Sequence, residues 1–394
     1  MAETDVLTSN LEGEKEDRFS TVDVVTVSGA HLVHDTYSSF LAPLLPVLIE
    51  NLTLTKTAAG LLSVFYMGPS LLQPVIGHLG DRHNLKFLII LAPTVAAVMM
   101  TLLGVAPTYA VIALLLIVAG LNSAGLHSIG PVLVGELSGR RLGRGMSYWM
   151  VGGEFARTLG PLILVSAVTL LTPRGLPWLM FGGMAASVVL YLRLRGVTDY
   201  RPPEGRRMAW GPALRQIRPI LLPVAGIVTF RALMFAGLST FLPTYLTENG
   251  SSLEMAGASL SVMEAAGVVG ALFGGVVSDR LGRRKVLLVM TLAAPLALLF
   301  FLNVRGWLLF PALLLIGLFF LSTTPVIMAL VQERAKESRA LSNGIFMALN
   351  FVITSIGTLV VGWIGDQFGL TTAFYIAAVS MLVGLPFVFA VPEG

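Results

Sequence analysis

Cysteine is absent from this chain of 394 residues. Its absence excludes disulfide bonds, thiolate metal sites and cysteine nucleophiles. Charge is also scarce: Asp, Glu, Lys and Arg make up 12% of the sequence, whereas soluble domains have about 25%. Hydrophobic residues make up 55%, and the mean hydropathy is +0.82. We therefore expect a protein that crosses the membrane many times.

Three further features are missing. The first 20 residues hold no apolar stretch and are unlike a signal peptide, so we expect a cytoplasmic tail over 1–20. There is no nucleotide-binding loop and no His-Glu-x-x-His sequence. The nearest stretch to a nucleophile elbow is "LHSIG" (126–130), in which Leu126 replaces the first glycine. We expect no enzyme activity and no cofactor; a membrane-embedded hydrolase is kept as a remote alternative.

Twelve apolar runs have the length of about 20 residues that a membrane-spanning helix needs. They predict an all-α membrane protein with twelve transmembrane helices. The runs lie near 21–49, 57–79, 87–105, 109–134, 145–171, 177–195, 219–247, 254–277, 286–303, 307–331, 343–363 and 371–391.

The longest polar connection, residues 196–218, predicts a basic cytoplasmic linker between a first bundle over 21–195 and a second over 219–394. Nineteen Lys and Arg residues lie in loops on the side of the N-terminus, against three on the other side. The positive-inside rule then places both termini in the cytoplasm and the chain in the cell membrane. Because the basic residues follow this topology, the pI near 9.5 does not predict a nucleic-acid partner.

The two halves repeat each other. Gly-x-x-x-Asp-Arg occurs at 77–82 and at 275–280, with the aspartates 198 residues apart. "SSFLAPLL" (38–45) and "STFLPTYL" (239–246) lie 201 residues apart. These echoes predict a duplicated unit, with two pseudo-symmetric six-helix bundles around a site at mid-membrane.

With these motifs the chain resembles the major facilitator superfamily of transporters over essentially its whole length. The family's loop signature, Gly-x-x-x-Asp-Arg-x-Gly-x-Arg/Lys, is complete in the second copy, whereas the first has Asn84 at the later glycine. Asn tolerates positive φ better than most residues, so the turn can survive there. The resemblance implies that the signature residues act in gating: Asp81, Arg82, Asp279, Arg280 and Arg284.

Two segments resemble one particular group within this superfamily. "HLVHD" (31–35) and "GGEFARTLGP" (152–161) are similar to the fosmidomycin-resistance group of drug exporters, which implies drug/proton antiport. The second segment keeps the Gly-Pro pair of the antiporter signature at 160–161 but lacks the Gly-Gly pair that follows in it. Its small residues form a ridge that lets another helix approach closely: Gly152, Ala156 and Gly160.

The first run contains His31, His34 and Asp35, which share one face of a helix because they are spaced three and four residues apart. Ionisable groups inside a membrane usually mark a substrate or proton path. We expect Asp35 to be the coupling acid, with the imidazoles tuning it or relaying the proton. Two alternatives stay open: a divalent-metal site on these three residues, and a purely structural network.

Other ionisable residues lie inside the runs. Glu154 and Arg157 are three residues apart and form either a self-neutralising pair or a coupling and binding pair. Glu264 has no partner on its own helix and is a further candidate for proton coupling. His127 is interpreted as structural or as part of a gate, although it could supply a metal ligand.

Arg231 is expected to bind an anionic substrate, because the repeat places it opposite the first run and arginine offers a planar fork to phosphate or carboxylate. The drug that gives the related group its name is an anionic phosphonate. The alternative is that Arg231 pairs with Asp35, Glu154 or Glu264. Further candidates for contact with substrate are Arg157, Gln73, Asn122, Asn350, Tyr37 and Tyr66.

We therefore expect a monomeric, proton-coupled secondary transporter that exports a small drug-like or anionic organic solute by alternating access. Its partners would be the lipid bilayer, protons and the solute. The alternatives are a proton symporter that imports a small organic anion and a divalent-metal exporter.

Overall fold

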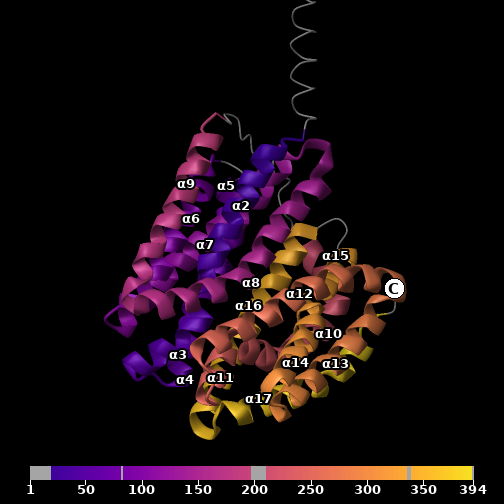
Figure 1. The fold of residues 1–394 in the computed structure, drawn as a ribbon. Helices are drawn as coiled ribbons and strands as arrows, with labels where there is room; N and C mark the ends of the chain where they lie inside the picture. The colour runs from indigo at the N-terminus through magenta and orange to yellow at the C-terminus, as the bar shows by residue number, and fades with distance from the viewer. Residues whose placement is uncertain (1–18, 81–82, 197–209, 335–338, 393–394) are drawn as a thin grey trace, which may run out of the picture.

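The computed structural model describes residues 19–80, 83–196, 210–334 and 339–392, which form helices joined by short loops (Figure 1). The first half contains α2 (Thr21–Ser38), α3 (Leu41–Leu52), α4 (Lys56–Met67), η1 (Gly68–Leu72), α5 (Gln73–Gly80), α6 (Lys86–Leu102), η2 (Leu103–Val105), α7 (Tyr109–Leu137), η3 (Gly139–Arg141), α8 (Leu142–Gly175), η4 (Leu176–Leu179) and α9 (Met180–Leu194). The second half contains α10 (Trp210–Ala236), η5 (Gly237–Phe241), α11 (Leu242–Glu248), α12 (Leu253–Leu281), α13 (Arg283–Asn303), η6 (Gly306–Leu308), α14 (Leu309–Ile316), η7 (Gly317–Leu321), α15 (Thr323–Arg334), α16 (Arg339–Phe368), α17 (Leu370–Val383) and α18 (Leu385–Phe389).

Eleven helical segments within the described residues are long and apolar enough to cross a membrane. One of them, Gly143–Leu194, has 52 residues and contains a break at Thr172, where φ is 60° and ψ is 168°. Pro173 follows directly, and a residue before proline is disfavoured in the α conformation. Because 52 residues would extend about 78 Å as one straight helix, this segment makes two crossings of a core about 30 Å thick. The twelve predicted spans are thus present.

The spans pack in the same order in both halves. In the first half α2 packs on α8, and α6 on α9; in the second, α10 packs on α16, and α13 on α17. These pairs correspond to spans 1 with 5 and 3 with 6, and to spans 7 with 11 and 9 with 12. The repeat seen in the sequence is therefore a repeat of the packing. The halves are joined most extensively by α8 with α12 and by α4 with α16; α3 also packs on α11 and α12.

Two spans contain a π-helical turn, η5 in span 7 and η7 in span 10. Each turn lies just before a proline, Pro243 or Pro325. Proline has no N–H group and its ring clashes with the carbonyl four residues earlier, so the regular hydrogen-bond ladder cannot pass through it. A wider turn accommodates the clash without breaking the span.

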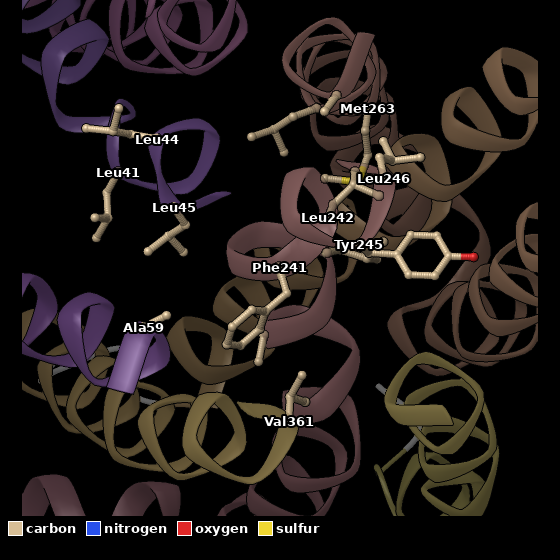
Figure 2. Close-up of a cluster of buried hydrophobic side chains, with 14 of the residues drawn as sticks. Leu41, Leu44, Leu45, Ala59, Phe241, Leu242, Tyr245, Leu246, Met263 and Val361 are labelled. Atoms are coloured by element: carbon tan, nitrogen blue, oxygen red, sulfur yellow. The ribbon is translucent and has the colours of Figure 1, made fainter. Parts of the chain in front are cut away.

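One end of the molecule, at which α3 meets α4 and α11 meets α12, is held together by a buried apolar cluster from both halves. We call it the closed end. Figure 2 shows Leu45 and Ala59 of the first half pointing toward Phe241 and Val361 of the second. The four side chains are fully buried. This apolar seal closes the path between the halves at that end.

The other end, where α5 and α12 terminate, has a separate core in each half. One buried cluster runs from Val24 to Leu194 and is confined to the first half; another runs from Ile217 to Val391 and is confined to the second. We call this the open end. Asn84 lies here and does not take the positive φ that the sequence suggested; its side-chain oxygen accepts from Lys86 N at 3.0 Å and caps α6.

Candidate functional site

The face of α2 predicted from the sequence is confirmed: His31, His34 and Asp35 form one hydrogen-bonded group. His31 Nε2 lies 3.1 Å from Asp35 Oδ2, and His34 Nδ1 lies 2.7 Å from Asp35 Oδ1. Both histidines are buried. A carboxylate and two imidazoles are thus grouped inside the bundle, where isolated charges are costly.

His127 joins this group from α7, although the sequence interpretation set it apart as structural or gating. Its Nε2 lies 3.2 Å from His31 Nε2 and 3.6 Å from Asp35 Oδ2. Trp149 of α8 stacks on the His31 ring, with 3.8 Å between ring centroids and 13° between planes. From the sequence, Trp149 was one of several aromatic residues that could line a cavity, and its contact with His31 was not predicted. The site is therefore built from spans 1, 4 and 5 of the first half.

The hydrogen bonds fix the tautomers of two of the histidines. His31 Nδ1 lies 3.0 Å from the carbonyl oxygen of Trp149, and His127 Nδ1 lies 2.9 Å from that of Ser123. A carbonyl oxygen only accepts, so both Nδ1 atoms donate. In the neutral rings both Nε2 atoms then carry lone pairs. These two atoms and Asp35 Oδ2, all within 4.8 Å of one another, form a set of three acceptors that we call the acceptor triad.

Three acceptors at hydrogen-bond distance repel unless a positive charge lies between them. One bound proton removes the conflict, because an imidazolium donates from Nε2 to Asp35 or to the other ring. A divalent cation could also bind the same three atoms. The arrangement is thus suited to taking up and releasing a cation.

The glycines of the 152–161 segment allow this geometry. A Cβ on Gly153 would lie 2.6 Å from His31 Cε1, and one on Gly152 would lie 2.5 Å from the carbonyl oxygen of Ser28. At Gly160 the added carbon would lie 2.5 Å from the carbonyl oxygen of Thr36. The helix that approaches the predicted ridge is therefore α2, and the approach brings α8 against the histidines.

One turn along α8, Arg157 links the two halves. It forms an ion pair with Glu154 on its own helix, as the spacing predicted. Its Nε atom also lies 3.4 Å from Glu264 Oε2 on α12, a partner that the sequence did not reveal. Arg157 thus links the helix that packs against the histidines to the second half.

Arg231 on α10 is buried, with 3% of its surface exposed. It donates to Thr324 Oγ1 at 3.0 Å, and its guanidinium carbon lies 4.5 Å from the ring centre of Phe320 and 5.5 Å from that of Phe235. Its Nε atom has no hydrogen-bond partner. Among the described residues no carboxylate lies within 4.0 Å of it, so the alternative pairing with Asp35, Glu154 or Glu264 is absent here.

The other candidates for contact with substrate lie in several places. Tyr37 donates to the carbonyl oxygen of Leu179 at 2.5 Å, and Asn122 Nδ2 to that of Ala92 at 3.0 Å. Tyr66 is partly buried and packs against the apolar cluster of the closed end. The backbone oxygens of Gln73 and Asn350 accept bonds from Ser128 and Thr354. The substrate roles of these residues stay predictions.

Of the gating candidates, Asp81 and Arg82 lie outside the described residues. Asp279 pairs with Arg283, which also donates to Glu333 at 2.7 Å. The Arg284 guanidinium lies 5.6 Å from the ring centre of Phe389, and Arg280 is exposed. These contacts of Asp279, Arg283 and Arg284 are all made within the second half.

Comparison with known proteins agrees with the fold. The model of the family described as Major Facilitator Superfamily matches residues 27–273 and 224–394. The fosmidomycin resistance protein of Escherichia coli is 26% identical over 379 residues, which cover 92% of this chain and 91% of that protein. An uncharacterised transporter of the same superfamily from Bacillus subtilis, YfnC, is 24% identical, with coverage of 92% and 91%.

Solved structures of low sequence identity share the architecture. A bacterial homologue of the human lysosomal transporter Spinster, in an inward-facing and occupied conformation, superposes with a TM-score of 0.78 at 15% identity, covering 94% of this chain and 96% of that one. A D-xylose–proton symporter superposes with a TM-score of 0.72 at 14% identity, covering 94% and 97%.

Proposed function

The chain belongs to the major facilitator superfamily of membrane transporters, and we propose that it exports a small drug-like or anionic organic solute in exchange for protons. Family membership makes it a transporter and not a membrane-embedded hydrolase. The observation that carries the proposal is the acceptor triad of His31, Asp35 and His127, whose geometry favours one bound proton. The E. coli relative's name, fosmidomycin resistance protein, supports export of a drug.

Proton release would act on the contact between the halves through Arg157. With a proton in the acceptor triad, the charge of Asp35 is balanced locally and Arg157 pairs with Glu154 and Glu264. Once the proton leaves, Asp35 attracts Arg157 more strongly and competes with Glu264 for it. Weakening this bridge between α8 and α12 changes the relative stability of the conformations that alternating access requires.

Arg231 would supply the substrate site with an anion-binding group. It is a buried cation without a carboxylate partner among the described residues, and such a group is stabilised by an incoming phosphonate or carboxylate. Phe235 and Phe320 beside it suit the apolar part of an organic solute. This arrangement favours a small organic anion over a cation as cargo.

The basic loops orient the molecule. The open end carries Arg280, Arg283 and Lys285, whereas Lys56, Arg174 and Arg305 lie in the loops of the closed end. The positive-inside rule then places the open end and both termini in the cytoplasm. The division into bundles at 21–195 and 219–394, joined by a linker over 196–218, follows from the same topology. The structure then corresponds to an inward-open monomer, ready to receive solute from the cytoplasm.

A flux assay tests the proposal. The purified chain in liposomes loaded with a pH indicator is given fosmidomycin first, then a panel of organic anions and cations, and proton movement is recorded. Anion-stimulated proton flux in the direction opposite to solute movement supports the proposal. Flux in the same direction indicates symport. A stoichiometric bound divalent metal that disappears in the variants His31→Ala and His127→Ala indicates the metal-export alternative.

A further inference from the structure

The loop signature has a third, degenerate copy at the closed end. Residues 362–369 read Gly-x-x-x-Asp-x-x-Gly, as do residues 275–282, but Gln367 stands where the second copy has arginine. In both places a long helix ends, one residue intervenes, and the next helix starts. The intervening glycines have nearly the same backbone angles: φ 83° and ψ 154° at Gly369, and φ 91° and ψ 142° at Gly282. Positive φ favours glycine, so the two turns are built alike.

The aspartate of this third copy crosses to the other half. Asp366 Oδ1 accepts from the backbone N of Lys56 at 2.6 Å. Its Oδ2 accepts from the N and the Oγ1 of Thr57 at 2.9 Å and 2.6 Å. Lys56 and Thr57 are the first two residues of α4, whose free N–H groups and positive helix end attract a carboxylate. Asp366, at the end of span 11 in the second half, thus caps the N-terminus of α4, which begins span 2 in the first half.

The first glycine of the motif shows how closely the partner helix approaches. A Cβ on Gly362 would lie 2.7 Å from the carbonyl oxygen of Lys56 and 2.8 Å from Thr57 Cα. At the corresponding Gly77 and Gly275 of the first two copies, an added Cβ meets no atom within 4 Å. The copy at the closed end is therefore packed against the opposite half, and the two glycines at the open end are not.

We infer that Asp366 and the N-terminus of α4 form the latch that holds the closed end shut, as the counterpart of the aspartates at the open end. Of the two motif aspartates that lie in the described residues, Asp366 contacts the opposite half and Asp279 does not. Asp279, which now pairs with Arg283 of its own half, becomes available to α8 when the open end closes. The first turn of α8 suits this role, because Arg141 before it makes no side-chain cap.

A neighbouring ion pair strengthens the latch. Lys56 Nζ lies 2.9 Å from Glu248 Oε1 on α11, so the residue that binds Asp366 through its backbone also binds the second half through its side chain. Both contacts break together when α4 leaves α16. The latch acts on the conformational balance and requires neither the proton nor the solute.

Distance measurements between spin labels test the inference without any transport assay. The chain has no cysteine, so labels can be placed at Asn51→Cys and Asn249→Cys, two exposed positions on opposite halves of the closed end. Asp366→Asn removes the charge from the cap, and we expect the fraction of molecules with a long label distance to rise roughly tenfold. Asp279→Asn is the matched control and should not raise it. A distribution in Asp366→Asn identical to that of the parent would overturn the inference.

A second pair of variants keeps the test decisive if Asp366→Asn does not fold. Gly362→Ala adds a carbon where the backbone of α4 leaves no room, so it should raise the long-distance fraction. Gly275→Ala adds the same carbon to the corresponding site at the open end, where there is space, and should not. Equal distributions in the two alanine variants would contradict the latch. Because no proton or solute is involved, failure of proton flux would leave these results unchanged.

Discussion

His31 and His127 present their Nε2 atoms to each other at 3.2 Å, while both Nδ1 atoms are bound to backbone carbonyl groups. Two neutral rings held in this way face each other with lone pairs, and Asp35 adds a third acceptor. The backbone bonds prevent the simplest relief, which would be a tautomer change in one ring. A proton bound between these groups would remove the conflict.

His127→Ala should abolish solute accumulation driven by a pH gradient, because it removes one of the two rings that we propose share the proton with Asp35. We expect solute exchange without a gradient to persist. His83→Ala is the control, since His83 is exposed at the open end and should behave like the parent. Normal accumulation in His127→Ala would show that the residue contributed by span 4 is dispensable for coupling.

Gly153→Ala should disrupt the site by steric means alone. The added carbon would lie 2.6 Å from His31 Cε1, so the ring must move, at a cost of about 1–3 kcal/mol in folding stability. Transport and the thermal unfolding temperature should both fall. Gly143→Ala, on the same helix but with no atom within 4 Å of the added carbon, should change neither. The prediction fails if the two variants are equally active and stable.

Glu264→Gln should loosen the link between α8 and α12, because Arg157 keeps only Glu154 as an anionic partner. We expect the balance between inward-open and outward-open molecules to shift by about tenfold, as a coupling of roughly 1.4 kcal/mol implies. Rates of cysteine labelling at the two ends measure this balance. Glu50→Gln, at an exposed position, serves as the control. Unchanged labelling rates would mean that the Arg157–Glu264 pair carries no coupling.

Arg231→Lys should weaken binding of an anionic solute such as fosmidomycin by about tenfold, because a point charge cannot replace the planar fork of the guanidinium. Folding should be nearly unchanged, since no carboxylate pairs with Arg231 among the described residues. Titration calorimetry compares the variant with the parent and with Arg174→Lys at an exposed site. Equal affinity in all three, or cargo that proves cationic, would rule out the anion-binding role.

The sequence was sufficient for features that depend on local spacing. Twelve apolar lengths, the echo between 77–82 and 275–280, and the shared face of His31, His34 and Asp35 follow from helix geometry and composition. The prediction of two separate spans in 143–194 also holds, although the helix there is nearly continuous. The break at Thr172 precedes Pro173, which is visible in the sequence.

Contacts between distant spans could not be obtained in this way. His127 is 96 residues from His31, and no spacing rule indicates which faces of α2 and α7 meet. The contact between Glu264 and Arg157 of the other half could not be predicted either, because the two residues are far apart in the sequence. The ridge of Gly152, Ala156 and Gly160 gave a usable signal, because it predicted a close approach, although it did not identify the helix that approaches. The third copy of the loop signature was hidden by Gln367 in place of its arginine.

The central claim, that the acceptor triad holds the coupling proton, is tested most directly by Asp35→Asn in liposomes. Two rates are measured in the same preparation: solute accumulation driven by a pH gradient, and exchange of labelled for unlabelled solute at equal pH. An amide cannot carry the negative charge that balances the proton, so accumulation should disappear while exchange continues. Undiminished pH-driven accumulation in Asp35→Asn would contradict the account.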